Sequence, residues 1–222
     1  MKVSHLIERG CMIAAAALLS ASLYAQQSTP SAHDIAARVD RHYNQLHSLR
    51  SGFSETYQGM GMKRTESGTL LLQKPGRMKW DYSSPPGKIF LLDGKYAWFY
   101  TAGDPRVQRI SAKKLDDLRS PLRFLLGHTE LEKELGNLTM SAGPNGSYTL
   151  TGLPKGLENR VKKLSLTVTP DGIITAIDVE ETSGALTHFT FSGEQTNVAI
   201  PPSTFKFTPP PGIPVVDALP PA

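Results

Sequence analysis

The sequence predicts one α+β domain in which an antiparallel sheet curls around two or three helices. Three observations predict this fold. Apolar residues at helical spacing come early in the chain. Two long stretches of alternating apolar and polar residues follow, and turn sequences divide each of them into strands. A helical insert separates the two stretches, so the expected order is a helix, about five strands, helices and five or six more strands.

The first 25 residues are expected to be a secretory signal peptide and not part of this domain. Lys2 and Arg9 give the segment a basic start. Residues 12–23 are apolar, and Ala25 is a small residue suited to cleavage. A membrane anchor is the alternative, but a helix that spans a bilayer needs about 20 apolar residues. We therefore expect an exported protein of the periplasm with one domain over residues 26–222.

Cysteine content and charge exclude several classes of site. Cys11 is the only cysteine, and the residues before it do not form a lipoprotein-type cleavage context. The expected mature chain has no disulfide, thiolate metal site or cysteine nucleophile, so its core alone must stabilise it. The formal net charge is +4, and the charged residues are interspersed. No basic stripe indicates binding to nucleic acid.

The first expected helix follows Ser31, which is a candidate N-cap with Asp34 in a weak capping-box pattern. The apolar residues that come next recur at helical spacing: Ile35, Val39, Tyr43 (or His42) and Leu46. The pattern predicts an amphipathic helix of about four turns that ends before Gly52.

The first β stretch begins at Phe53, where the apolar period changes to two. Met78, Trp80 and Tyr82 point to one side of the expected strand, and Lys79 and Asp81 to the other. Three turn sequences divide the stretch: Pro75-Gly76, Pro85-Pro86-Gly87 and Asp93-Gly94. Both faces are apolar in Ile89–Leu92, so alternation does not tell which face of that strand is concave.

The helical insert is expected to run in three pieces: Ser111–Arg119, a helix that restarts at Ser120-Pro121 and carries Leu122, Leu125 and Leu126, and a turn or two over Glu130–Leu135. Further strands are expected after Leu138, over Tyr148–Thr151, Val161–Thr169, Ile173–Glu181, Leu186–Ser192 and Thr204–Thr208. Hairpin turns are expected at Asp171-Gly172 and Ser183-Gly184, which makes strands adjacent in sequence antiparallel neighbours in space.

Motifs for catalysis and metal binding are not present. The sequence has no nucleophile elbow, no H-E-x-x-H and no P-loop. His33, His42 and His47 share the first helix at spacings of nine and five, which does not place them on one face as ligands. Glu180 and Glu181 are adjacent in a strand and face opposite sides. We expect no catalytic residue, no metal and no cofactor.

Several segments, in this order behind a signal peptide, carry a family resemblance: Gln73–Tyr82, Asp93–Tyr100, Pro121–Gly127, Phe205–Pro210 and Val215–Asp217. Through them, and over essentially the whole mature chain, the protein resembles the LolA family of periplasmic carriers of outer-membrane lipoproteins. The resemblance implies an unclosed antiparallel β half-barrel of about eleven strands, with helices that cap an apolar concave face.

The resemblance also implies a function and its partners. A family member binds the acyl chains of lipoproteins that an inner-membrane ABC transporter releases, and it delivers them to a receptor lipoprotein on the outer membrane. Such a shuttle is expected to be monomeric and to need no cofactor. An acyl chain of about 15 methylenes gains about 12 kcal/mol on burial, so a carrier needs a large apolar concave surface.

The candidate site residues are apolar or aromatic side chains of the first β stretch. Those expected to line the acyl-chain cavity are Leu70, Leu72, Met78, Trp80, Tyr82, Leu91 and Trp98. Those expected to form the lid are Lys74, Leu122, Leu125 and Leu126. By the resemblance, Lys74 stands where the family has an Arg that holds the lid through backbone carbonyls, and Lys lacks that planar donor fork. In any β protein the apolar residues could equally form an ordinary core.

Two other functions stay open. A lipid-binding or lipoprotein-sensing module could use the same half-barrel, although a dedicated sensor usually adds a second domain for which the mature chain leaves no room. A lipid hydrolase could assemble its site from residues far apart in sequence, and labelling of a serine by a lipid-analogue probe would support it.

Overall fold

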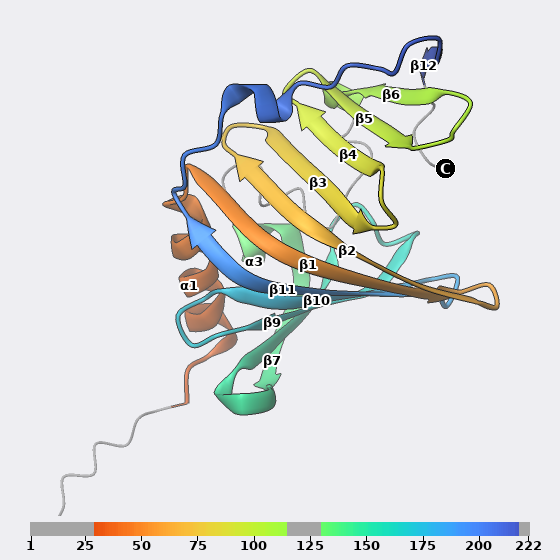
Figure 1. Ribbon diagram of the computed structural model, residues 1–222. Coiled ribbons are helices and arrows are strands. Elements are labelled where there is room, and N and C mark those ends of the chain that lie inside the picture. Colours follow the sequence, from red (N-terminus) through yellow and green to blue (C-terminus); the bar gives the residue numbers. More distant parts are fainter. Residues whose placement is uncertain (1–28, 115–129, 218–222) are drawn as a thin grey trace, which may run out of the picture.

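The computed structural model describes residues 29–114 and 130–217. The expected signal peptide and the lid candidates Leu122, Leu125 and Leu126 lie outside these residues. The described residues form one sheet of twelve strands, with α1 and α3 on one of its faces (Figure 1). No helix in the described ranges is long and apolar enough to cross a membrane.

Most of the expected strands are found, and their bounds are as follows. The strands are β1 (Ser48–Gly59), β2 (Met62–Gln73), β3 (Arg77–Ser84), β4 (Lys88–Asp93), β5 (Tyr96–Thr101), β6 (Val107–Ser111), β7 (Leu135–Ala142), β8 (Tyr148–Pro154), β9 (Val161–Val168), β10 (Ile174–Glu181), β11 (Leu186–Thr196) and β12 (Val215–Asp217). The helices are α1 (Ala32–Asn44), α3 (Leu131–Glu134) and the short 3₁₀ segments η1 (Ala112–Lys114), η3 (Pro144–Gly146) and η4 (Pro202–Phe205).

The strand order is β12-β6-β5-β4-β3-β2-β1-β11-β10-β9-β8-β7. Every pair is antiparallel except β12 with β6, which is parallel. Because β12 and β7 lie at opposite ends of this order, the sheet does not close. The expected unclosed half-barrel is confirmed, with one strand more than the eleven expected.

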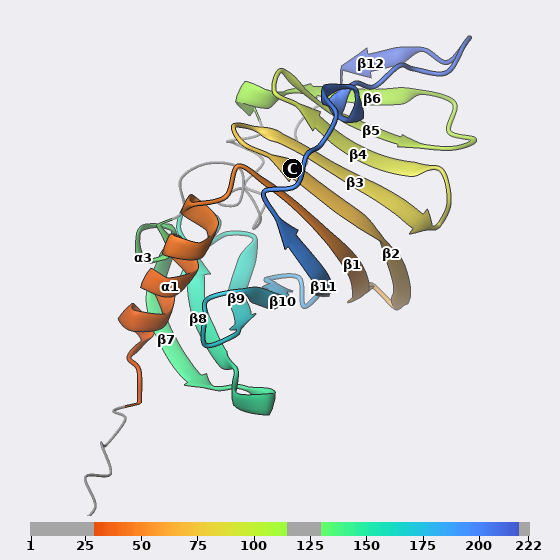
Figure 2. The same ribbon diagram turned by 60° about the vertical axis from the view of Figure 1, so that its left-hand side comes forward.

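Helix α1 begins where the capping box predicts. The Asp34 amide donates to Ser31 Oγ at 3.1 Å, and the Ser31 amide donates to Asp34 Oδ2 at 2.9 Å. Its buried face is Ile35, Ala36, Val39 and Tyr43. The helix ends at Asn44, earlier than expected, because Ser48 already pairs with Gln73 of β2. The helix packs beside α3 and near β7 and β8 (Figure 2).

The predicted hairpin turns are confirmed, since Asp93-Gly94 joins β4 to β5 and Asp171-Gly172 joins β9 to β10. Gly94 and Gly172 have positive φ angles of 94° and 90°, which glycine adopts without steric cost. At Gly172 a side chain would also collide with α1, because a Cβ there would lie 2.5 Å from the carbonyl carbon of Arg38. The β9–β10 turn therefore fits closely against the helix.

Two expected elements differ from the structure. Thr204–Thr208 does not form a strand: η4 occupies Pro202–Phe205, and the chain then runs on without regular structure to β12. Pro201, Pro202, Pro209 and Pro210 flank this segment and lack the amide donors that a strand needs. Within the expected helix Ser111–Arg119, Ser111 belongs to β6 and only η1 is helical among the described residues.

Candidate functional site

An extended apolar surface lies on the face of the sheet against which α1 packs, here called the inner face. Strand register places its residues in rows that run across the strands. One row is Leu49, Leu72, Met78, Leu92, Ala97 and Ile110. The next row is Ser51, Leu70, Trp80, Phe90 and Phe99. Most of these residues join the buried residues of α1 in one apolar cluster.

Aromatic rings gather at the middle of the inner face. The Trp80 ring lies 4.6 Å from that of Phe53 and 5.6 Å from that of Phe189, centroid to centroid. The Phe90 and Phe99 rings lie 4.8 Å apart on β4 and β5. The Trp80 indole N–H donates to Met78 Sδ at 2.9 Å, a weak acceptor that leaves this part of the face apolar.

The inner face is only partly covered. Met78 and Trp80 are buried, with 3% and 4% of their surface exposed. Tyr82, Phe90, Phe99, Phe189 and Phe191 pack against the same cluster but are half-buried. These five rings offer apolar surface that the described residues do not cover, as a site for an apolar ligand requires.

One end of the inner face carries ionisable groups. Glu55 and Glu66 are cross-strand partners next to the aromatic cluster. Lys88 forms an ion pair with Glu66 and lies over the Tyr82 ring, 4.4 Å from its centroid. Burial, followed by the charge of Glu66, raises the pKa of Glu55. Burial likewise raises the pKa of the Tyr82 hydroxyl.

The last turn of α1 is fastened to the other end of the inner face. Lys74 Nζ donates to the Tyr43 carbonyl at 2.7 Å, and burial lowers the pKa of this amine. The Tyr43 hydroxyl donates to Glu194 Oε2 at 3.2 Å and accepts from the Ile174 amide at 3.1 Å. His42 Nε2 lies 2.6 Å from Glu194 Oε1. These bonds tie the helix to the turn after β2, to β10 and to β11.

Two of the seven predicted cavity residues do not lie on the inner face. Leu70, Leu72, Met78, Trp80 and Tyr82 do, as the register shows. Leu91 and Trp98 pair with each other and with Lys79, and therefore face the opposite side, here called the outer face. The expectation that they share a surface with Met78 is wrong.

Leu91 and Trp98 have partners on the outer face. Trp98 Nε1 donates to Asp93 Oδ2 at 2.8 Å, and its ring lies 5.5 Å from that of Phe207 in the C-terminal segment. Leu91 is 1% exposed on a strand that η4 contacts. Both side chains serve the packing of the C-terminal segment on the sheet.

The space between α1 and the inner face is small. A cavity of about 20 Å³ lies there, lined by Tyr43, Leu49, Ser51, Leu70, Ile174, Phe191 and Glu194. Ligand sites for drug-sized molecules have volumes of about 300–1,000 Å³. A large ligand could use this part of the face only after α1 moved away from the sheet.

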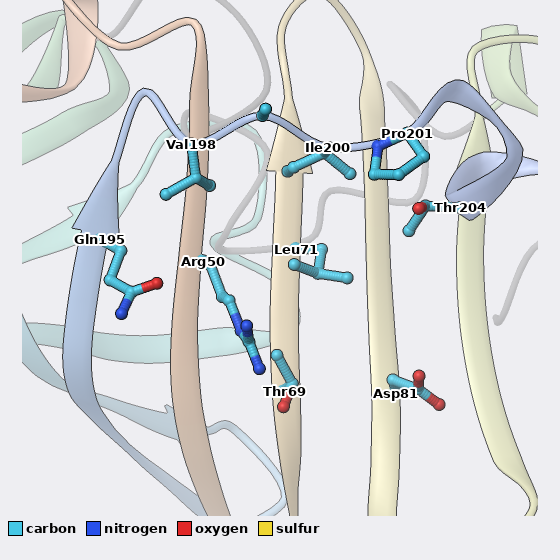
Figure 3. Close-up of a pocket in the computed structure, with 10 residues that line it drawn as sticks. Arg50, Thr69, Leu71, Asp81, Gln195, Val198, Ile200, Pro201 and Thr204 are labelled. Carbon is cyan, nitrogen blue, oxygen red and sulfur yellow. The ribbon is translucent and has the colours of Figure 1, made fainter.

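A larger groove, of about 320 Å³, lies on the outer face beneath the C-terminal segment (Figure 3). It mixes polar and apolar side chains: Arg50, Thr69, Leu71, Asp81, Gln195, Val198, Ala199, Ile200, Pro201 and Thr204. The Arg50 side chain extends between β1 and β2 into this groove (Figure 3). Because charged groups line it, it suits an acyl chain less well than the inner face does.

Sequence reasoning missed several inner-face aromatic residues. Phe90 and Phe99 lie directly across from each other, and Phe53, Phe189 and Phe191 lie near Trp80. Register with Trp80 places Phe90 and Phe99 on the inner face, and alternation within their own strands does not. The contact of β1 with β11 depends on pairing between distant parts of the chain, which local patterns do not contain. Within the described residues, no group of three or more His, Cys, Asp or Glu side chains could hold a metal ion.

Comparisons with known proteins find relatives of this chain. A model of the family described as outer membrane lipoprotein carrier protein LolA matches residues 44–208. An outer-membrane lipoprotein carrier protein of Nitrosospira multiformis is 30% identical over 172 residues, 76% of this chain and 81% of that protein. One of Edwardsiella ictaluri is 28% identical over 203 residues, 90% of this chain and 92% of that protein.

A solved structure of an uncharacterized conserved protein from Thermus thermophilus has a similar fold. Its TM-score is 0.53 at 13% sequence identity, and the match covers 84% of this chain and 99% of that one. At this identity the likeness concerns the fold alone.

Proposed function

The chain belongs to the LolA family of outer membrane lipoprotein carrier proteins, and from this premise we propose that it carries acylated lipoproteins across the periplasm. Residues 1–25 would direct export and be removed, leaving a monomeric carrier of residues 26–222. It would take its cargo from an inner-membrane ABC transporter and pass it to a receptor lipoprotein on the outer membrane. The role is binding and release, with no catalytic step.

The observation that carries this proposal is the half-buried aromatic surface of the inner face. Acyl chains would lie against Tyr82, Phe90, Phe99, Phe189 and Phe191, with Leu70, Leu72, Met78 and Trp80 forming the apolar floor. Each buried methylene contributes about 0.8 kcal/mol, so an extended row of apolar side chains across several strands gives the required affinity. Leu91 and Trp98 have no part in this site.

Cargo would enter by displacing the helical cover. The cavity of about 20 Å³ between α1 and the sheet is far too small for an acyl chain. Lys74 holds the last turn of α1 through a single hydrogen bond to the Tyr43 carbonyl, so it is the proposed latch of this part of the cover. Loading then shifts the population from a covered to an open state, and cargo affinity is lowered by the cost of opening.

The first test is a release assay. Spheroplasts are incubated with the protein recovered from the periplasm, and the supernatant is examined for acylated lipoprotein in a one-to-one soluble complex. The proposal expects such a complex. If free lipid co-purifies but no lipoprotein is released, the function is that of another lipid-binding module with this fold.

A matched pair of variants tests the site. Phe99 and Tyr100 are adjacent, aromatic and half-buried, but they face the inner and outer sides of the sheet. Phe99→Gln should lower the recovered lipoprotein about tenfold, because the polar amide would meet acyl methylenes without a hydrogen-bond partner. Tyr100→Gln should leave recovery near that of the parent protein. Equal losses in both variants would reject the inner face as the binding surface.

A further inference from the structure

The β1–β2 hairpin projects beyond the rest of the sheet, on the side away from α1 (Figure 1). Pairing of β2 with β3 stops at Ser67, so Met62–Glu66 extend past that neighbour with β1 alone beside them. Five residues of strand correspond to about 17 Å. On the other side, pairing of β1 with β11 ends at Gln58 and Leu186. A Cβ at Gly59 would lie 2.7 Å from Ala185 Cβ of the β10–β11 turn, so only the two-residue turn of Met60 and Gly61 extends past both neighbours.

Two methionines are exposed at this tip. Met60 is 88% exposed and Met62 is 60% exposed, the two highest values among the large apolar side chains of the described residues. Leu186, on the neighbouring strand, is 48% exposed. Apolar side chains at a projecting tip gain nothing from the core of the protein, so folding does not explain them.

The backbone makes the methionine at position 60 more unusual. Met60 and Gly61 both have positive φ, 52° and 75°, as the two central residues of a type I′ hairpin turn must. Asn-Gly is the preferred sequence for such a turn, and bulky side chains rarely adopt this conformation. Turn formation would favour asparagine at position 60, so the methionine needs another reason.

Cations accompany the methionines. The Lys63 side chain is exposed and makes no hydrogen bond or ion pair with any residue of the described ranges. Strand register puts Lys63 in one row with Gln58, Leu186, Glu180 and Lys163. Lys162 and Lys163 both bind Glu180, at 2.6 and 3.3 Å, so cations outnumber carboxylates in this row and its contacts. Arg64 is less available, because it lies over Tyr57 and 3.8 Å from Glu66.

We propose that the hairpin tip is a membrane-contact element that binds the interface of an anionic bilayer. Met60 and Met62 enter the boundary between headgroups and acyl chains, and Lys63 approaches the lipid phosphates. Two side chains on a convex tip are far short of the roughly 800 Å² that each partner buries in a stable protein complex. A convex apolar tip with flanking cations suits a bilayer surface better than a protein groove.

The test measures flotation of the protein with lipid vesicles. The protein is taken in the form recovered from the periplasm, so that the apolar segment from Met12 to Leu23 does not contribute. One set of vesicles contains equal amounts of phosphatidylcholine and phosphatidylglycerol, and the other contains phosphatidylcholine alone. The parent protein should bind the anionic vesicles more strongly than the neutral ones, and added salt should weaken this binding.

Three variants dissect the tip. Met60→Asn/Met62→Thr suits the turn and the strand, so the fold should be retained, while binding to anionic vesicles should fall about tenfold. Lys63→Gln should lower binding to anionic vesicles about fivefold and leave binding to neutral ones unchanged. Val215→Thr is the control, because it replaces an apolar side chain that is 38% exposed elsewhere on the surface. It should change binding to neither the anionic nor the neutral vesicles.

The outcomes separate this proposal from the carrier function. The membrane contact would be overturned if the parent protein bound anionic vesicles no more strongly than the double methionine variant does. It would also be overturned if the double variant bound vesicles normally but released less lipoprotein from spheroplasts, since the tip would then meet a membrane protein. Vesicle binding that depends on the methionines, without any lipoprotein release, would leave the membrane contact standing and reject the carrier proposal.

Discussion

The two faces of the sheet are built from the same strands, yet they differ in side chains and in what covers them. On the inner face, rows of apolar residues cross several strands, and α1 and α3 cover only part of them. On the outer face, Arg50, Lys79 and Arg109 alternate with apolar residues, and the C-terminal segment with η4 lies over β3 and β4. The first arrangement suits an exchangeable apolar ligand, and the second a permanent intramolecular contact.

The difference teaches that burial alone does not identify a ligand surface. Leu91 is as deeply buried as Leu70, each 1% exposed, but the two lie on opposite faces. The half-buried rings of Phe90 and Phe99 are better candidates for cargo contact, because part of their apolar surface remains free.

The largest effect should separate the two tryptophans. Trp80→Ala should lower the free energy of unfolding by about 3–5 kcal/mol, because it leaves a cavity beneath the aromatic cluster. Trp98→Ala should cost only about 1–2 kcal/mol, because that ring is partly exposed and contacts chiefly the C-terminal segment. Urea denaturation measures both. Equal losses would mean that the two faces contribute alike to the core.

The next effect concerns the attachment of α1 to the inner face. Lys74→Met removes the hydrogen bond to the Tyr43 carbonyl and should lower the free energy of unfolding by about 1–2 kcal/mol. Amide hydrogen exchange in the last turn of α1 should accelerate at the same time. Lys74→Arg keeps a donor and should restore slow exchange. Unchanged exchange in Lys74→Met would show that other contacts hold the helix.

Two carboxyl groups should respond to pH in opposite ways. Burial would raise the pKa of Asp93 on the outer face, but bonds from the Trp98 indole and the Tyr96 and Lys95 amides hold it below its ordinary value. This stabilisation is present above the unfolded pKa and is lost as the pH falls. Asp93→Asn should therefore cost about 1 kcal/mol at neutral pH and flatten the acid side of the stability curve.

The pKa of Glu55 on the inner face is shifted in the opposite direction, because burial and the charge of Glu66 raise it above its ordinary value. Glu55 contributes to the stability of the folded protein below its unfolded pKa, and this contribution is lost as the pH rises through its folded pKa. Glu55→Gln should therefore raise the free energy of unfolding at neutral pH. Denaturant titrations from acid to neutral pH measure both variants. A stabilised Asp93→Asn or a destabilised Glu55→Gln would contradict the assignment.

The smallest effect lies at the hairpin tip, outside both faces. Met60→Asn should raise the free energy of unfolding by about 0.5–1 kcal/mol, because asparagine adopts positive φ at lower cost than methionine. Thermal unfolding measures the change. A loss of stability would mean that the Met60 side chain has a packing role that its 88% exposure does not suggest.

Local signals in the sequence predicted much of the fold. The Ser31 capping box, the Asp93-Gly94 hairpin and the alternation around Trp80 depend on near neighbours, and each is found in the structure. The inner face could be predicted only in part. In Ile89–Leu92 both faces of the strand are apolar, because one belongs to the apolar inner face and the other meets the C-terminal segment. Only the register with β3 assigns Leu91 to the outer face.

The conformation of the C-terminal segment could not be predicted from local sequence patterns, for a related reason. Apolar and polar residues alternate in Thr204–Thr208 as they do in a strand. The flanking prolines and the burial of Phe205 instead make it an irregular segment that lies across the outer face. Its position depends on a surface formed by residues far earlier in the chain. No pattern within the segment itself carries that information.

The pairing of β12 with β6 also sets an order for folding. Arg109 and Asp217 are 108 residues apart, and their side chains meet at 2.9 Å across this parallel pair. Because β12 is the last strand of the chain, the β6 edge of the sheet has unpaired backbone groups until β12 arrives. Exposed sheet edges are templates for aggregation, and a holding chaperone would be needed most during this interval. Strand β12 therefore protects this edge of the sheet last, after its other strands are available to pair.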